Sequence, residues 1–419
     1  MTAAAITASP KPVTIGAGVV GLLVLVTFIN YVDRGNLATA APLLKDELHL
    51  SSTQIGLLLS AFFWSYTPSQ ILAGWLAEQI NAYRTLAIGL ALWALTTAAM
   101  GLATGFVALF VLRLLLGLGE SAAFPCSSKL LAQHLPPHRL GGANGLIGAG
   151  LALGPAFGTF TGGLLMAHLG WRPVFLLFGL ISLLWLWPWL RATRHASASE
   201  RDRIRGPQPS MAAILGQRGL WGASLGHFSA NYAMYFVISW LPLYLVKARG
   251  FTVAEMATLG GLIYLVYAAS STFAGWASDR WIGSGVSVNV ARKTIAVACH
   301  VVVAASLLVC AFGDRTTSVA CLFVAAVAFG FNSPCLFAIG QTLAGPDAAG
   351  KWIGVQNCIG NVAGILGPII TGMVVDRTGE FFWAFVITCV VSLVGVVGWA
   401  FIIKRVEPVD WGLATTAAS

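Results

Sequence analysis

Four charged side chains, Asp33, Arg34, Arg113 and Glu120, lie within strongly apolar stretches of this 419-residue chain. On membrane-insertion scales each of them costs about 2.5–3.5 kcal/mol at the centre of a bilayer. Such a cost is tolerated when the charges face a water-filled cavity and pair with one another, and two acids balance two bases here. We therefore treat the four as candidate functional residues.

These residue types have a definite chemistry. An arginine binds a carboxylate through two parallel hydrogen bonds and stays charged in any environment. A carboxyl group in a partly dry cavity can carry a proton near neutral pH. An anion would then find a cation to bind and proton carriers beside it, which is the minimum for proton-coupled uptake. The alternative is that the four charges only hold two helices together.

The spacing of the four charges indicates how they are placed. Arg113 and Glu120 are seven residues apart, so they share one helix face, separated by about 10 Å along the axis. Asp33 and Arg34 are adjacent and diverge by about 100°. One of this second pair can therefore line a cavity while the other faces a neighbouring helix.

The composition is that of a protein embedded in a lipid bilayer. Hydrophobic residues make up 57% and charged residues 9%, against about 25% charged in average soluble chains. So few charges exclude a cytosolic enzyme, a nucleic-acid-binding module and a disordered chain. We therefore expect no nucleic-acid partner, and we interpret the net charge of +9 as a signal of membrane topology.

Apolar runs and helix breakers predict an all-α membrane protein with twelve transmembrane helices in two six-helix bundles. The domains expected are an N-terminal bundle, 1–191, a cytoplasmic linker, 192–217, and a C-terminal bundle, 218–419. The predicted helices are 15–41, 54–78, 85–104, 106–131, 140–166, 171–191, 218–246, 254–279, 292–313, 316–344, 351–375 and 381–404.

The lysines and arginines predict that both termini are cytoplasmic. With the N-terminus inside, 16 of them fall in cytoplasmic segments and 6 in outside loops, with Arg34 and Arg113 in the membrane. An excess of cations on one side favours that side as the cytoplasm. We expect a multi-pass protein of a bacterial inner (plasma) membrane.

Four dipeptides recur in the same order in the two halves, at offsets of 201 to 213 residues. Two six-helix halves related by such a parallel repeat imply a central cavity between them. The pairs are Asn30-Tyr31 with Asn231-Tyr232, Gly74-Trp75 with Gly275-Trp276, Pro125-Cys126 with Pro334-Cys335, and Gly154-Pro155 with Gly367-Pro368.

Two loops in matching positions combine a glycine with charged residues. The first includes Gly74, Glu78 and Arg84, and the second includes Gly275, Asp279 and Arg280. We expect each acid to pair with a cation across the interface between the halves and so to hold an outward-open state. Ordinary polar loop residues are the alternative.

Glycines at four-residue spacing occur around Gly150-Gly154-Gly158 and again around Gly360-Gly364-Gly367. Small residues at this spacing let a neighbouring helix approach closely. We expect these helices to form the surfaces that rock between the halves, with plain tight packing as the alternative.

The second half carries no charge inside its apolar spans and offers hydroxyl, amide and imidazole groups instead. Such groups near a carboxylate-binding arginine suit a polyhydroxylated ligand, although singly each is more often a helix–helix hydrogen bond. They are His227, Asn231, Tyr232, Tyr235, Asn332, Ser333, Gln356, Asn357 and Asn361.

An enzyme would need a nucleophile with a base, or a metal constellation. His227 and His300 lie on different predicted helices without acidic partners in sequence reach, and the seven cysteines show no metal-ligand spacing. We expect no enzymatic activity, no cofactor and no metal.

Several of these segments resemble the anion:cation symporter branch of the major facilitator superfamily. The resemblance lies in Asn30-Tyr31-Val32-Asp33-Arg34, in Arg113 with Glu120 and Phe124-Pro125, in Trp64-Ser65-Tyr66, and in the run 240–245. The two glycine loops resemble the cytoplasmic loop motif of the superfamily, although the first copy has Glu78 in place of its Asp. Overall the chain is similar to bacterial transporters of galactonate, glucarate and hexuronates.

The resemblance implies roles for individual residues. Arg34 would bind the substrate carboxylate with Tyr31 and Tyr66 beside it, and Asn357 would contact the substrate. Asp33 and Glu120 would be the protonation sites, with Arg113 tuning Glu120. Where galactonate-type relatives have a Gln near this acid, the chain has Leu151, which favours a smaller or less hydroxylated acid.

We therefore expect a monomeric major facilitator transporter that imports an organic monoanion, most plausibly a sugar acid, with protons by alternating access. Asn231, Tyr235 and Gln356 complete the predicted substrate site. The alternatives are an exchanger or uniporter for another anion, such as phosphate or an aromatic acid, and a membrane sensor that binds its ligand without moving it.

Overall fold

The computed structural model describes residues 16–50, 52–204 and 208–412. In the first half of the chain the helices are α1 (Ala17–Glu47), α2 (Ser52–Leu76), η1 (Ala77–Asn81), α3 (Ala82–Met100), α4 (Phe106–Glu120), α5 (Ala123–His134), η2 (Pro137–Arg139), α6 (Leu140–Leu169), α7 (Trp171–Leu183) and α8 (Leu186–Ile204).

The second half repeats this plan after a short helix in the linker. Its helices are α9 (Met211–Leu215), α10 (Arg218–Leu243), η3 (Tyr244–Ala248), α11 (Val253–Gly283), α12 (Val288–Phe312), α13 (Arg315–Ala344), α14 (Ala349–Thr378), α15 (Phe382–Val397) and η4 (Gly398–Ile402). The described residues contain no strand.

These elements form twelve long helical segments, since α4 continues into α5 and α7 into α8. Eight of the segments in the described residues are long and apolar enough to cross a membrane by composition alone. The other four are α2, α3, α10 and α11. They carry buried polar side chains such as Gln70, Thr97 and Ser271, which lower their hydropathy but face the protein interior. The predicted all-helical fold is confirmed.

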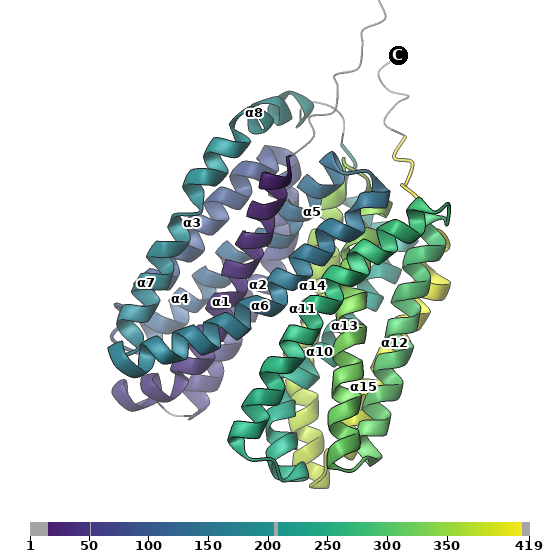
Figure 1. The fold of residues 1–419 in the computed structure, drawn as a ribbon. Helices are drawn as coiled ribbons and strands as arrows, with labels where there is room; N and C mark the ends of the chain where they lie inside the picture. Colours follow the sequence, from purple (N-terminus) through teal and green to yellow (C-terminus); the bar gives the residue numbers. More distant parts are fainter. Residues whose placement is uncertain (1–15, 51, 205–207, 413–419) are drawn as a thin grey trace, which may run out of the picture.

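The two six-helix bundles lie side by side, with α1–α8 in one and α10–α15 in the other (Figure 1). Within the bundles α1 packs on α6 and α10 packs on α14, while between them α6 packs on α11 and α2 on α14. We call the end of the bundles that carries linker residues 208–215 the linker end, and we call the opposite end the far end.

The repeat detected in the sequence corresponds to equivalent packing in the two bundles. A Cβ added at Gly154 of α6 would meet Tyr31 of α1, and one added at Gly367 of α14 would lie 3.7 Å from the Tyr232 ring of α10. Both glycines and both tyrosines belong to the repeated dipeptides. The same helix pair is therefore packed by the same residue types in each half.

The α6 glycines that we expected at the interface between the bundles pack inside their own bundle instead. Gly150, Gly154 and Gly158 all approach α1 within their own bundle. The glycines between the bundles lie nearer the linker end: Gly141 and Gly145 of α6 approach α11, and Gly350 and Gly354 of α14 approach α2. The spacing predicted close approach correctly but does not tell which neighbouring helix approaches.

Several predicted boundaries differ from the structure. The predicted helix 106–131 is interrupted after Glu120 and resumes at Ala123, where Pro125 has no N–H to donate to the carbonyl four residues earlier. The predicted linker 192–217 begins as a helix, because α8 continues to Ile204. Residues 1–15, 205–207 and 413–419 of the three predicted domains lie outside the described residues.

At the linker end α11 approaches α6 closely and α2 approaches α14 closely. We predict that Gly275→Ala weakens the first contact and Gly74→Ala the second. A Cβ on these glycines would overlap the carbonyls of Gly141 and Gly350, and overpacking costs about 1–3 kcal/mol. We expect hydrogen exchange in the first turns of α6 and α14 to accelerate about tenfold. Gly260→Ala is the matched control on α11, because its Cβ would meet nothing within 4 Å. Equal exchange in all three variants would contradict this packing.

Candidate functional site

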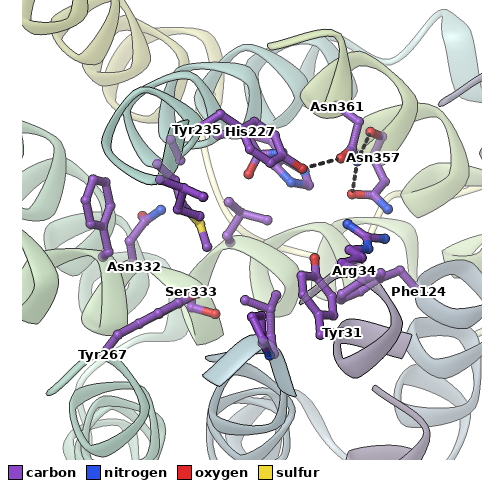
Figure 2. Close-up of a pocket in the computed structure, with 18 of the residues that line it drawn as sticks. Tyr31, Arg34, Phe124, His227, Tyr235, Tyr267, Asn332, Ser333, Asn357 and Asn361 are labelled. Atoms are coloured by element: carbon purple, nitrogen blue, oxygen red, sulfur yellow. Dashed lines mark hydrogen bonds between the residues drawn. The ribbon is translucent and has the colours of Figure 1, made fainter. Parts of the chain in front are cut away.

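A cavity of about 340 Å³ lies between the two bundles (Figure 2). Its walls come from α1, α2, α5 and α6 of the first bundle and from α10, α11, α13 and α14 of the second. This size lies within the range of pockets that bind small molecules, about 300–1,000 Å³. A ligand in it would touch both halves of the molecule.

Arg34 is the one lysine or arginine among the described residues that line this cavity, and no acid lines it. Its guanidinium carbon lies 4.3 Å from the ring centre of Tyr31, 4.8 Å from Phe62 and 4.7 Å from Tyr66. Arg34 Nε lies 3.4 Å from Oε2 of Glu120, whose side chain is fully buried. The cation is thus held by an aromatic cage and an acid behind it.

Asp33 points away from the cavity, as the 100° divergence from Arg34 predicts. Its side chain is 4% exposed, and the Thr97 hydroxyl of α3 donates a hydrogen bond of 3.2 Å to Oδ2. No ion pair with Asp33 occurs within the described part of the chain. The acid is therefore buried inside the first bundle with a neutral donor.

Arg113 is buried behind the aromatic cage. Its Nε donates to the Leu58 carbonyl at 3.1 Å, and its guanidinium carbon lies 5.1 Å from the Phe62 ring centre. The guanidinium carbon of Arg34 lies 4.8 Å from the centre of the same ring, so both cations contact Phe62. Of the four charges only Arg34 lines the cavity, so the helix face that Arg113 and Glu120 share does not line it.

The second bundle contributes neutral polar groups along α10 and α14. Tyr235 donates from its hydroxyl to Asn361 Oδ1 at 2.9 Å, and the Asn361 amide donates to Asn357 Oδ1 at 3.0 Å (Figure 2). The Asn231 amide donates to the Gly360 carbonyl at 3.1 Å. Asn231, Tyr235 and Asn357 all line the cavity, as their predicted roles require.

Gln356 does not line the cavity, although it was expected among the substrate contacts. It is fully buried between helices, where its amide donates to the Leu336 carbonyl at 3.3 Å and its oxygen accepts from the Trp352 indole at 3.2 Å. Its neighbour Asn357 takes the cavity-facing position because adjacent helical residues diverge by about 100°.

The structure adds two tyrosines that the sequence reasoning missed, Tyr264 and Tyr267 of α11. Their spacing of three residues puts them on one helix face, which was a usable signal because the rest of 257–272 consists of small and aliphatic residues. Leu151 also lines the cavity, so the residue that departs from the galactonate-type pattern does face the space where a ligand would bind.

A second, larger space of about 650 Å³ adjoins the cavity and shares Pro155, Met234 and Tyr267 with it. Its further walls are residues such as Phe160 and Leu164 of α6 and Met256 of α11, which lie toward the far end. The space is mainly apolar. The apolar space therefore adjoins the cavity toward the far end.

At the linker end the two predicted loop acids bridge the bundles. Asp279 of α11 accepts hydrogen bonds from the backbone N–H groups of Gly141 at 3.0 Å and Gly142 at 2.6 Å, at the start of α6. Glu78 of η1 accepts from the Gly350 N–H at 2.8 Å, at the start of α14. Each acid thus caps the N-terminus of a helix in the opposite bundle, where the helix dipole favours negative charge.

The expected cation partners lie within each acid's own half. Lys129 Nζ lies 2.8 Å from Glu78 Oε2, and Arg292 Nη2 lies 3.3 Å from Asp279 Oδ1. The expected pairing of acid with cation across the interface is therefore corrected to acid with helix N-terminus. Arg84 and Arg280, also expected at the gate, have exposed side chains.

The linker touches both bundles at this same place. The Gln208 amide donates to the Glu78 carbonyl at 2.9 Å, and Lys351 Nζ donates to the Pro209 carbonyl at 2.8 Å. The Asn144 amide of α6 donates to Gln341 Oε1 of α13 at 2.7 Å nearby. These bonds hold the two bundles together at the linker end.

A family model described as Major Facilitator Superfamily matches residues 23–368 and 286–418. The chain belongs to the major facilitator superfamily. Its members are membrane transporters, so this protein is a multi-pass transporter and not an enzyme.

The transporter is similar to a hexuronate transporter of Bacillus subtilis, with 29% identity covering 88% of this chain and 90% of the relative. It is 28% identical to a D-galactonate transporter of Escherichia coli, over 93% of this chain and 95% of the relative. The E. coli fucose:proton symporter FucP has the same fold, with a TM-score of 0.74, 16% identity and coverage of 93% and 99%.

The buried pair of Glu78 and Lys129 predicts a strong effect of removing one partner. Glu78→Ala leaves a 2% exposed ammonium group without its carboxylate, which costs about 3–5 kcal/mol and lowers the melting temperature of this transporter. We expect the double variant with Lys129→Met to recover most of that loss. Arg315→Ala, which breaks the exposed pair with Glu255, is the control and costs about 0–1 kcal/mol. Equal losses in the two single variants would contradict the assignment.

Proposed function

We propose that this transporter imports an organic monoanion, in the first instance a sugar acid, together with protons. The observation that carries the proposal is the single cation of the cavity, Arg34, caged by aromatic rings and backed by Glu120. One guanidinium fork matches one carboxylate. The neutral hydroxyl and amide groups of the opposite wall suit a hydroxylated remainder of the ligand.

The pair of Arg34 and Glu120 supports a direct means of coupling. Arg34 Nε and Nη2 both lie 3.4 Å from the same oxygen, Glu120 Oε2. A proton bound by Glu120 removes that negative charge and leaves the guanidinium to bind a ligand carboxylate instead. Loss of the proton restores the internal pair and displaces the anion. Proton and anion would therefore bind together and leave together.

Asp33 serves in this proposal as a second proton carrier. It is buried beside Thr97 and has no cation within hydrogen-bond distance in the described residues, so binding a proton removes a buried charge. Two protons with one monoanion would carry one net positive charge inward. The membrane potential would then assist uptake by about 2.3 kcal/mol per 100 mV.

The contacts between the bundles at the linker end support the orientation of this cycle. We place that end in the cytoplasm of a bacterial inner membrane, with both termini on the same side, because the excess of cations favours it. In the outward-open state the acids take up protons and the anion binds Arg34. The halves then rock, and the higher internal pH releases the protons. A monomer suffices, because one chain encloses the whole cavity.

Substitution of Arg34 tests the anion site. Arg34→Lys keeps the charge but loses the fork, and hydrogen bonds to charged groups are worth about 1.5–3 kcal/mol, so we expect affinity for sugar acids to fall about 10- to 100-fold. The double variant R34A/E120Q removes both charges together and should bind no acid. Thermal-shift titration of purified protein measures both. Arg194→Ala, an exposed charge on α8, is the control. Parental affinity in R34A/E120Q would overturn the proposal.

Neutral variants of the two acids test proton coupling. In Asp33→Asn and Glu120→Gln we expect counterflow exchange of labelled sugar acid in proteoliposomes to persist, while uphill accumulation driven by external acid is lost. Glu407→Gln, an exposed acid, should accumulate substrate like the parent. An exchanger or uniporter is identified instead if the parent protein itself shows counterflow but no acid-driven accumulation.

A further inference from the structure

The imidazole of His227 lies at the base of the cavity on α10, where the chain first turns from the linker end into the bundle. It is 3% exposed and lines the cavity. Its ring packs against the α14 backbone, since a Cβ at Gly360 would lie 2.7 Å from the imidazole Cδ2. The Phe337 ring lies 5.5 Å away at an angle of 82°. Packing on both sides thus fixes the plane of the ring.

His227 belongs to a stripe with Asn231 and Tyr235, at intervals of four residues on one face of α10; His227 and Tyr235 are labelled in Figure 2. The Asn231 amide is bonded to the Gly360 carbonyl and the Tyr235 hydroxyl to Asn361. His227 Nδ1, in contrast, is buried and has no hydrogen-bond partner among the described residues. A Cβ built at Gly360 would lie 3.0 Å from Nδ1, so this nitrogen faces α14. The opposite edge of the ring carries Nε2, for which the described residues likewise provide no hydrogen-bond partner, and His227 lines the cavity. Buried polar atoms in folded proteins are nearly always paired, so an unpaired Nε2 in the cavity wall points to a ligand.

A second buried histidine, His300, has partners for both of its ring nitrogens, so a buried imidazole in this chain need not be left unpaired. His300 of α12 is 2% exposed, and its two ring nitrogens contact the carbonyls of Ala296 at 2.9 Å and Gly226 at 3.2 Å. His300 is therefore satisfied by the protein alone. His227, in contrast, lies in the cavity wall with a ring nitrogen that has no hydrogen-bond partner among the described residues.

We propose that His227 is a specificity-determining residue that hydrogen-bonds a hydroxyl group of the bound anion, at a distance from the carboxylate held by Arg34. This rests on the proposed function. A neutral imidazole offers one donor and one acceptor, which a hydroxyl group can satisfy in either direction. A ligand that lacks the hydroxyl leaves Nε2 unpaired, and sites of this kind reject such analogues strongly.

The contact also ties the two bundles together through the ligand. Arg34 belongs to α1 in the first bundle, and His227 belongs to α10 in the second. An anion bound at both ends would favour closure of the halves around it, whereas a short acid bound to Arg34 alone would not. The hydroxylated acids are thereby selected for transport as well as for binding.

The test compares His227→Leu and His227→Gln with the parent protein in proteoliposome uptake and thermal-shift titration. The probes are a hexonate, a hexuronate and unsubstituted monocarboxylates of similar length. In His227→Leu we expect the KM for the hydroxylated acids to rise about tenfold or more. The preference over unsubstituted acids should be largely lost, and kcat for the hydroxylated acids should fall as well, because the contact that favours closure of the halves is missing. His227→Gln keeps a donor and an acceptor and should stay within about threefold of the parent.

His300→Gln is the structural control, expected to lower the melting temperature without changing the preference. The inference is overturned if the parent transports hydroxylated acids and His227→Leu keeps the parental preference, or if His300→Gln changes the preference equally. If the parent protein neither binds nor transports any of the acids, the proposed function itself fails, and that outcome is distinct from a failure of the role of His227.

Discussion

The contact between Arg34 and Glu120 is the interaction on which the rest of the site depends. A guanidinium group cannot lose its charge, and in a low-dielectric interior it needs a counter-charge. Glu120 supplies one from behind, while Tyr31, Phe62 and Tyr66 surround the remaining face. Any anion that binds at this place must take over the role of Glu120. The burial of a single arginine thus links anion binding to the charge state of one acid.

The two bundles contribute different kinds of polar side chain to the site. The four intramembrane charges all lie in the first bundle, and three of them are buried behind the cavity wall. The second bundle supplies the neutral ladder of His227, Asn231 and Tyr235 against α14. The charged groups that the proposed function assigns to anion and proton binding therefore lie in one half, and the neutral hydrogen-bonding groups of the cavity wall lie in the other.

The linker end is held together by contacts of moderate strength. Asp279 and Glu78 each bind backbone N–H groups at the start of a helix in the opposite bundle, and a charge at a helix terminus contributes typically 0.3–1 kcal/mol and up to about 2 kcal/mol. The stronger partners, Lys129 and Arg292, form their ion pairs within the same half as the acids. Neither ion pair therefore depends on contact between the two halves.

The sequence by itself determined the membrane class, the twelve helices, the repeat and the four intramembrane charges, because hydropathy and the cost of buried charge are local properties of the chain. It also determined that Asp33 and Arg34 face different ways. Only the tertiary structure decided that Arg34 alone reaches the cavity, that Gln356 is turned away from it, and that the glycines of α6 around Gly154 pack on α1. Helical periodicity tells which residues share a face, but the neighbour of that face is set by how all twelve helices pack together.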